Sequence, residues 1–119
     1  MGKILIVDDS SAELASLRTI VQDLGWSSVT ASSGAEAMAK AVSEKPNLIL
    51  MDIVMPDMDG FEACRQLQAD QATRSIPIVF VSSKSQKADQ MWAKMQGAKA
   101  LIPKPITSAA IADALKAYA

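Results

Sequence analysis

Short apolar runs alternate along the chain with longer segments in which apolar residues recur every three or four positions. The runs occupy residues 4–7, 28–31, 48–51, 78–81 and 100–102. Apolar runs without alternation are typical of strands buried on both faces, as in a parallel sheet. The run at 28–31 is more polar, which is typical of an edge strand. The periodic segments between the runs predict amphipathic helices.

Residues that start and end helices support this division. Ser10 or Ser11, Ser33, and Thr107 or Ser108 precede periodic segments as candidate N-caps, whereas Gly25 ends the first segment and Gly97 ends the fourth. Strand and helix therefore alternate five times within 119 residues, which is the length of one domain. We predict a single α/β domain over residues 1–119. It is a (βα)5 three-layer sandwich whose parallel five-stranded sheet has the flavodoxin-like order 2-1-3-4-5.

Composition excludes several classes of function. The net charge is −1, so no overall positive field attracts nucleic acid or an anionic membrane. The four-residue apolar run near the N-terminus is too short for a signal peptide or a membrane span. The chain has no histidine, which excludes Ser-His-Asp catalysis and histidine zinc sites. Its single cysteine, Cys64, cannot form an internal disulfide, and we expect a cytoplasmic protein.

The side chains able to take part in chemistry fall where the predicted strands end. Asp8 and Asp9 follow the first strand, Asp52 follows the third, Ser82 follows the fourth, and Lys104 comes just after the fifth. Each residue type also has a simpler role. The aspartates and the serine can cap helices or form turns, and the lysine can be solvated on the surface. Their coincidence at the ends of neighbouring strands favours one shared site.

Three carboxylates, a hydroxyl and an ammonium together suit phosphoryl chemistry. Clustered carboxylates repel one another, and Mg²⁺, a hard cation that prefers oxygen ligands, relieves that repulsion. One carboxylate can then act as a nucleophile toward phosphorus and form an acyl phosphate. The ammonium and the hydroxyl supply positive charge and hydrogen bonds to the phosphoryl oxygens.

Over its whole length the chain resembles the CheY-like receiver domains of bacterial two-component response regulators. The matching motifs are ILIVDDS at 4–10, LMDIVMPDMDG at 50–60, VSS at 81–83 and Lys104-Pro105. The resemblance implies a signalling domain rather than a metabolic enzyme. It also implies that a sensor histidine kinase is the partner that donates the phosphoryl group, so that the histidine missing here belongs to the donor.

The resemblance implies a role for each acidic position. Asp52 would be the phosphoacceptor. Asp9 would bind Mg²⁺ directly, and Asp8 would act partly through water. The backbone carbonyl of Val54 would be a further metal ligand.

The resemblance also implies the roles of the residues around the phosphoryl group. Ser82 would donate a hydrogen bond to it, and Lys104 would pair with one of its oxygens. The Lys104–Pro105 peptide is usually cis in this family. Gly60 would permit the backbone geometry after the acceptor loop. Leu101 stands where the family usually has the aromatic residue that couples to the Ser82 position, so the usual output switch is in doubt.

The predicted fourth helix carries an unusual apolar stripe. Ala88, Met91, Trp92 and Met95 recur at helical spacing and are predicted to face inward. The alternative is a partly exposed surface for a downstream protein, on the face of helix 4, strand 5 and helix 5 that response regulators commonly use. The stretch 84–98 is similar to twitching-motility receivers of the PilH type, which suggests chemotaxis-like or type IV pilus control.

Other functions remain open on the sequence. An intact acidic site is compatible with a phosphate sink or relay intermediate, and Leu101 is compatible with a non-phosphorylated scaffold. An aspartyl phosphohydrolase would need a carboxylate where Val54 stands, and a flavin carrier would need a phosphate loop where Asp8 and Asp9 stand. The chain ends soon after the last predicted helix, so we expect a receiver without an output domain.

Overall fold

Five parallel strands form one sheet in the order β2-β1-β3-β4-β5. The computed structural model describes residues 2–119. The strands are β1 (Lys3–Val7), β2 (Ser27–Ala31), β3 (Leu48–Met51), β4 (Ile78–Ser82) and β5 (Ala100–Pro103). The predicted strand order is confirmed, and each strand begins and ends within about one residue of the predicted run.

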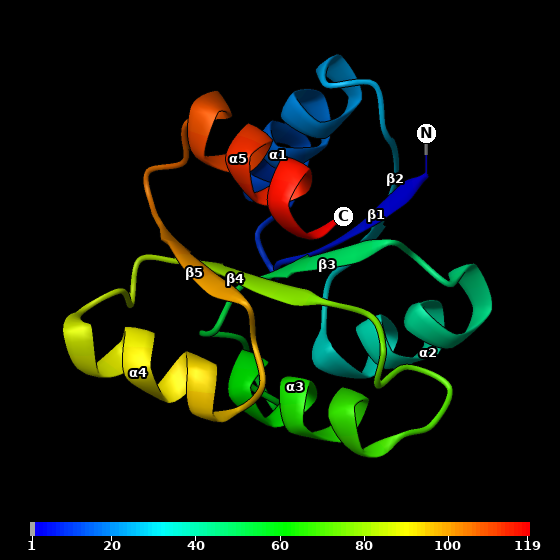
Figure 1. The fold of residues 1–119 in the computed structure, drawn as a ribbon, viewed down its shortest axis with the longest axis vertical. Helices are drawn as coiled ribbons and strands as arrows, with labels where there is room; N and C mark the ends of the chain where they lie inside the picture. Colours follow the sequence, from blue (N-terminus) through cyan, green and yellow to red (C-terminus); the bar gives the residue numbers. More distant parts are fainter. Residues whose placement is uncertain (1) are drawn as a thin grey trace.

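A helix follows each strand, and the helices cover both faces of the sheet. They are α1 (Ser11–Asp23), α2 (Gly34–Glu44), α3 (Gly60–Ala69), α4 (Lys87–Met95) and α5 (Ser108–Tyr118). The helices α1 and α5 lie on one face, and α2, α3 and α4 lie on the other (Figure 1). Side-chain oxygens of Ser10, Ser33 and Thr107 accept hydrogen bonds from first-turn backbone N–H groups, which confirms three of the predicted caps. No helix within residues 2–119 is both long and apolar enough to cross a bilayer.

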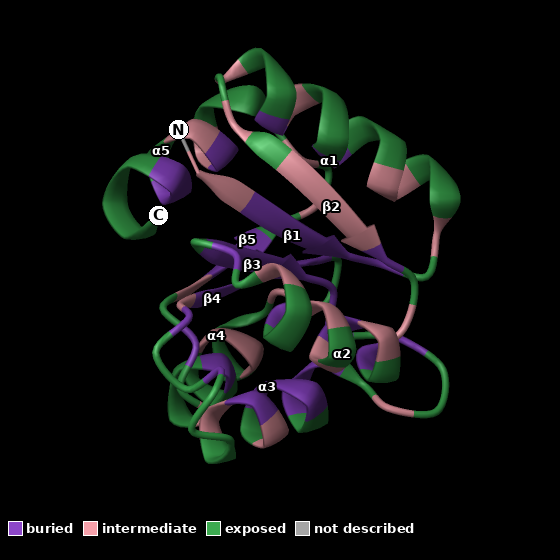
Figure 2. Ribbon diagram, turned by 90° about the vertical axis from the view of Figure 1, so that its right-hand side faces the viewer, coloured by how far each residue is buried: buried purple, intermediate pink, exposed green. Residues whose placement is uncertain are grey.

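The core has two layers, one on each side of the sheet. In β1, Ile4 and Ile6 pack with residues of α1 and α5, whereas Leu5 and Val7 pack with residues of α2 and α3. Successive strand residues point to opposite faces, so a strand covered on both faces is apolar at every position. Figure 2 shows the buried strands between helices whose outer sides are exposed. The edge strand β2 is only partly buried, as its polarity predicts.

The prediction that the stripe of α4 faces inward is wrong. Met91, Trp92 and Met95 are 59%, 45% and 71% exposed, and Ala88 is also exposed. The buried residue of α4 is Ala93, whose small side chain lies at the contact with the sheet and α3. Helical periodicity identifies residues that share a face, but it does not determine whether that face points to the core or to solvent.

Candidate functional site

The first two acidic residues of the site are held by the sheet. Val7 pairs with Met51 in the register of β1 and β3, so Asp8 and Asp52 are the next residues of adjacent strands. The Asp52 N–H donates to the Val7 carbonyl at 3.0 Å, and the Asp8 N–H donates to the Ala31 carbonyl at 3.1 Å. These bonds fix both backbones at the carboxyl edge of the sheet, where doubly wound folds bind ligands.

The structure brings together the three predicted carboxylates. One carboxylate oxygen from each of Asp8, Asp9 and Asp52 lies within 4.8 Å of the others. Asp8 and Asp52 are buried, at 1% and 8% exposure, whereas Asp9 is exposed. Asp8 Oδ1 accepts from the Ser10 N–H at 2.9 Å, and Asp52 Oδ1 accepts from the Ile53 N–H at 2.7 Å. Each buried carboxylate therefore keeps its second oxygen for another partner.

Lys104 supplies that partner. Its Nζ lies 2.9 Å from Asp8 Oδ2 and 3.3 Å from Asp52 Oδ2, and 4.0 Å from Glu13 Oε2. Burial lowers the pKa of Lys104, but the hydrogen bond to Asp8 and the charges of Asp52, Asp8 and Glu13 outweigh burial and raise it above its usual value. The lysine is therefore a charged group that offsets part of the negative charge of the acidic cluster.

Sequence reasoning missed Glu13. It lies in the first turn of α1, and its backbone N–H donates to Ser10 Oγ at 3.3 Å. Its place three residues after the N-cap is the usual position of an acidic residue in a capping box. Because α1 starts at the carboxyl end of β1, that place also brings Glu13 to the edge of the site.

Ser82 and Lys104 are positioned by neighbouring strands. Ser82 is the last residue of β4, is fully buried, and pairs with Pro103 of β5. Its carbonyl accepts from the Lys104 N–H at 3.0 Å. Its Oγ accepts from the Lys84 N–H at 3.1 Å, which leaves the hydroxyl hydrogen for a ligand. The Lys104–Pro105 peptide is cis, as the resemblance implies.

This constellation on a five-stranded parallel sheet agrees with the match of the chain to a family model. The model for the response regulator receiver domain matches residues 4–116. The chain belongs to the response regulator receiver family. Receiver domains are signalling domains rather than classical enzymes.

Two curated receiver relatives are similar over most of their length. Protein PilH of Pseudomonas aeruginosa is 43% identical over 106 residues, which are 89% of this chain and 88% of the relative. Protein PilG of the same organism is 30% identical over 116 residues, which are 98% of this chain and 86% of the relative. The structure of the chemotaxis protein CheY4 of Vibrio cholerae superposes with a TM-score of 0.93 at 28% identity, covering 100% of this chain and 99% of that one.

Receiver domains bind Mg²⁺ in their active site, and the residues present here fit that ion. The donor atoms are all carboxylate oxygens, which suit a hard cation, and Asp9 gives the cluster an exposed side. Lys104 pairs with Asp8 and Asp52. This pairing leaves the Asp9 carboxylate accessible to a cation. The Val54 side chain is 59% exposed beside this receiver site, and the metal-binding role of its carbonyl stays a prediction.

Gly60 is required by a close approach between two backbone segments. Its φ lies outside the left-handed region that favours glycine. A Cβ at this position would lie 2.2 Å from the Asp52 carbonyl oxygen and 2.8 Å from Ile53 Cα. The Gly60 N–H also donates to the Ile53 carbonyl at 2.7 Å. Gly60 therefore allows the start of α3 to approach the backbone of Asp52 and Ile53.

Leu101 is buried, whereas Met91, Trp92 and Met95 of α4 are exposed. It is 7% exposed, pairs with Phe80 across the sheet, and belongs to the core cluster that includes Ala93. Leu101 is therefore part of the core of this receiver and contributes little exposed surface. Its role in switching stays a prediction.

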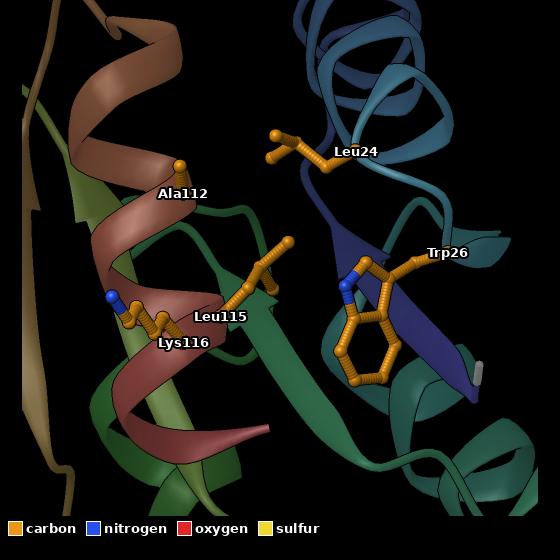
Figure 3. Close-up of a pocket in the computed structure, with 5 residues that line it drawn as sticks. All are labelled: Leu24, Trp26, Ala112, Leu115 and Lys116. Carbon is orange, nitrogen blue, oxygen red and sulfur yellow. The ribbon is translucent and has the colours of Figure 1, made fainter.

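A pocket lies far from the acidic cluster. Leu24, Trp26, Ala112, Leu115 and Lys116 line it (Figure 3). Leu24 follows the end of α1, and Trp26 precedes β2, so the pocket is at the amino edge of the sheet, opposite the receiver site. Its apolar lining belongs to the core layer between α1 and α5.

Proposed function

We propose that this receiver accepts a phosphoryl group on Asp52 from the phosphohistidine of a partner kinase and signals through a phosphorylation-dependent protein contact. The observation that supports this most directly is the Lys104 ammonium, 2.9 Å from Asp8 and 3.3 Å from Asp52, beside three clustered carboxylates. This arrangement provides a nucleophile together with the positive charge that a phosphoryl group requires.

The proposed transfer uses the residues of the site as follows. A carboxylate oxygen of Asp52 attacks phosphorus while the bond from phosphorus to the histidine nitrogen breaks, and the imidazole keeps the electron pair. Lys104 pairs with a phosphoryl oxygen, and the Ser82 hydroxyl donates a hydrogen bond to another. Asp8, Asp9 and the Val54 carbonyl would hold Mg²⁺, which neutralises the charge of the phosphoryl oxygens when bound.

The relatives suggest the pathway. PilH and PilG match this chain over most of their own length, at 43% and 30% identity. We propose that the chain acts in a chemotaxis-like pathway that controls pilus motility, in the cytoplasm, where response regulators generally work. The downstream partner would then be a protein rather than nucleic acid.

Intact-mass measurement after incubation with acetyl phosphate and Mg²⁺ tests the phosphoacceptor role. We expect the wild type to gain one phosphoryl group, and we expect Asp52→Asn or EDTA to abolish the gain. Asp57→Asn is the matched control, because Asp57 is an exposed carboxylate of the same loop. No gain by the wild type, even with a phosphorylated kinase present, would refute the proposal and favour a non-phosphorylated scaffold. A gain that survives Asp52→Asn would refute the assignment of Asp52.

A further inference from the structure

The Lys104 ammonium has three carboxylates around it, and one of them has no part in the proposed transfer. Asp8 Oδ2 lies 2.9 Å from Nζ, Asp52 Oδ2 lies 3.3 Å away, and Glu13 Oε2 lies 4.0 Å away. The contact with Glu13 is longer than a hydrogen bond and is therefore an ion pair. Asp52 would carry the phosphoryl group and Asp8 would help to hold the metal, whereas Glu13 has neither task.

The carboxylate of Glu13 is free to pair with Lys104 because its usual partner is occupied. Glu13 is the third residue after the N-cap Ser10, and in a capping box its side chain would accept from the Ser10 N–H. Asp8 Oδ1 accepts from that N–H at 2.9 Å instead. In α4, by contrast, Asp89 holds the same helix position and does accept from the N–H of its own N-cap, at 2.9 Å. Within residues 2–119, the charged partner of the Glu13 carboxylate within 4.0 Å is Lys104.

The position of the Lys104 ammonium depends on these contacts. The Lys104 backbone is fixed, because its N–H donates to the Ser82 carbonyl at 3.0 Å. Four methylene groups separate that backbone from the ammonium, and a side chain of this length has many rotamers. The ammonium has three hydrogens to donate, so three acceptors can fix its position. The surrounding carboxylates therefore determine where the positive charge lies.

The proposed transfer disturbs two of the three contacts. Asp52 Oδ1 accepts from the Ile53 N–H at 2.7 Å, so Oδ2 is the oxygen available for attack, and Oδ2 is the oxygen that pairs with Lys104. Lys104 must therefore exchange Asp52 for a phosphoryl oxygen while it stays at the site. A metal bound by Asp8 would compete for the second contact. The contact with Glu13 is the one that neither event removes.

We propose that Glu13 is a positioning residue for phosphoryl transfer, which holds the Lys104 ammonium at the site while Asp52 is exchanged for a phosphoryl oxygen. Glu13 contacts neither the donor nor the metal in this scheme and acts through Lys104 alone. Without Glu13, the ammonium would remain drawn to Asp8 and Asp52, and the attacking oxygen would stay paired. The inference rests on the proposed function, because it names a further residue for the same reaction.

The initial rate of phosphorylation of Glu13→Gln tests the proposal. Acetyl phosphate is the donor, intact mass is the readout, and Mg²⁺ is raised until the rate no longer changes. We expect Glu13→Gln to be phosphorylated at least threefold more slowly than the wild type. Loss of a negative charge would by itself speed the approach of an anionic donor, so a slower rate has the sign of lost positioning. Glu62→Gln is the matched control and should keep the wild-type rate, because Glu62 is an exposed residue, third after the N-cap Asp59 of α3.

A double-mutant cycle tests whether Glu13 acts through Lys104. Lys104→Met should slow phosphorylation by itself, and adding Glu13→Gln to it should change the rate less than twofold. The same four proteins are unfolded in urea with EDTA and without a donor. Glu13→Gln should lower the urea midpoint more in the wild type than in Lys104→Met, since any effect on the helix itself is common to both backgrounds. Lys104→Gln takes the place of Lys104→Met if circular dichroism shows that the latter does not fold.

Four results would overturn the role of Glu13. They are an unchanged or faster rate for Glu13→Gln, an equal slowing by Glu13→Gln in the wild type and in Lys104→Met, an equal shift of the urea midpoint in both backgrounds, and an equal slowing by Glu62→Gln. If the wild type gained no phosphoryl group, the proposed function would fail and this role with it. A wild-type gain accompanied by any of the four results refutes the role of Glu13 alone.

Discussion

Replacing Gly60 by alanine tests how the acceptor segment is built. The added Cβ would lie 2.2 Å from the Asp52 carbonyl oxygen, whereas ordinary contacts of this kind are 3.4–4 Å. The start of α3 and the acceptor backbone must therefore separate by about 1 Å, and the 2.7 Å hydrogen bond from Gly60 to Ile53 must lengthen. Overpacking of this kind costs about 1–3 kcal/mol. For a domain of this size, the cost corresponds to a fall in Tm of about 4–12 °C.

Gly34→Ala is the matched control. Like Gly60, Gly34 is a buried glycine at the first position of a helix, where it follows the N-cap Ser33. Its added Cβ would instead meet the flexible Met58 side chain, with Sδ at 2.9 Å. Met58 can move, and alanine favours the helix, so we expect stability within about 1 kcal/mol of the wild type.

Urea unfolding followed by far-UV circular dichroism measures both glycine variants, and the rate of phosphorylation by acetyl phosphate reports the displacement of Asp52. We expect Gly60→Ala to lose both stability and rate, and Gly34→Ala to keep both. If the two variants were equally stable, the close approach of α3 to Asp52 would not be the reason for glycine at position 60.

Two further predictions concern ionisable groups. Lys104→Met removes the ammonium 2.9 Å from buried Asp8 and should reduce the free energy of unfolding by about 1–3 kcal/mol at neutral pH, because Asp8 loses its hydrogen-bond partner. Because the pKa of Lys104 is raised in the folded protein, its contribution to the free energy of unfolding is present up to the usual pKa near 10.5 and is lost at higher pH. If urea titrations showed that the wild type lost its extra stability over the variant by about pH 9, the result would contradict the ion pair. Burial raises the pKa of the Cys64 thiol to about 11, so Ellman's reagent at about pH 8 should label it only in urea. Labelling of the native protein would show that α3 opens readily.

The position of each acidic residue at a strand end could be predicted, but its environment could not. Asp8 and Asp9 are adjacent in the sequence, yet Asp8 is 1% exposed and bonded to Lys104, whereas Asp9 is exposed. Successive residues leaving a strand point in different directions, and the neighbouring strand decides which one is covered. Glu13 reaches Lys104 only because α1 begins at the same edge of the sheet, a contact that spacing alone does not reveal.

The sequence by itself determined the alternation of strand and helix, and it placed Asp8, Asp9, Asp52, Ser82 and Lys104 at the carboxyl ends of the strands. Apolar runs buried on both faces and capped helices are local signals, and they favour a parallel sheet with right-handed crossovers. Only the tertiary structure decided that the stripe of Met91, Trp92 and Met95 faces solvent, and that Gly60 serves a close backbone contact. The exposure of the stripe and the contact at Gly60 both depend on how closely neighbouring helices and strands pack. The packing distance is set by side chains that are far apart in the sequence.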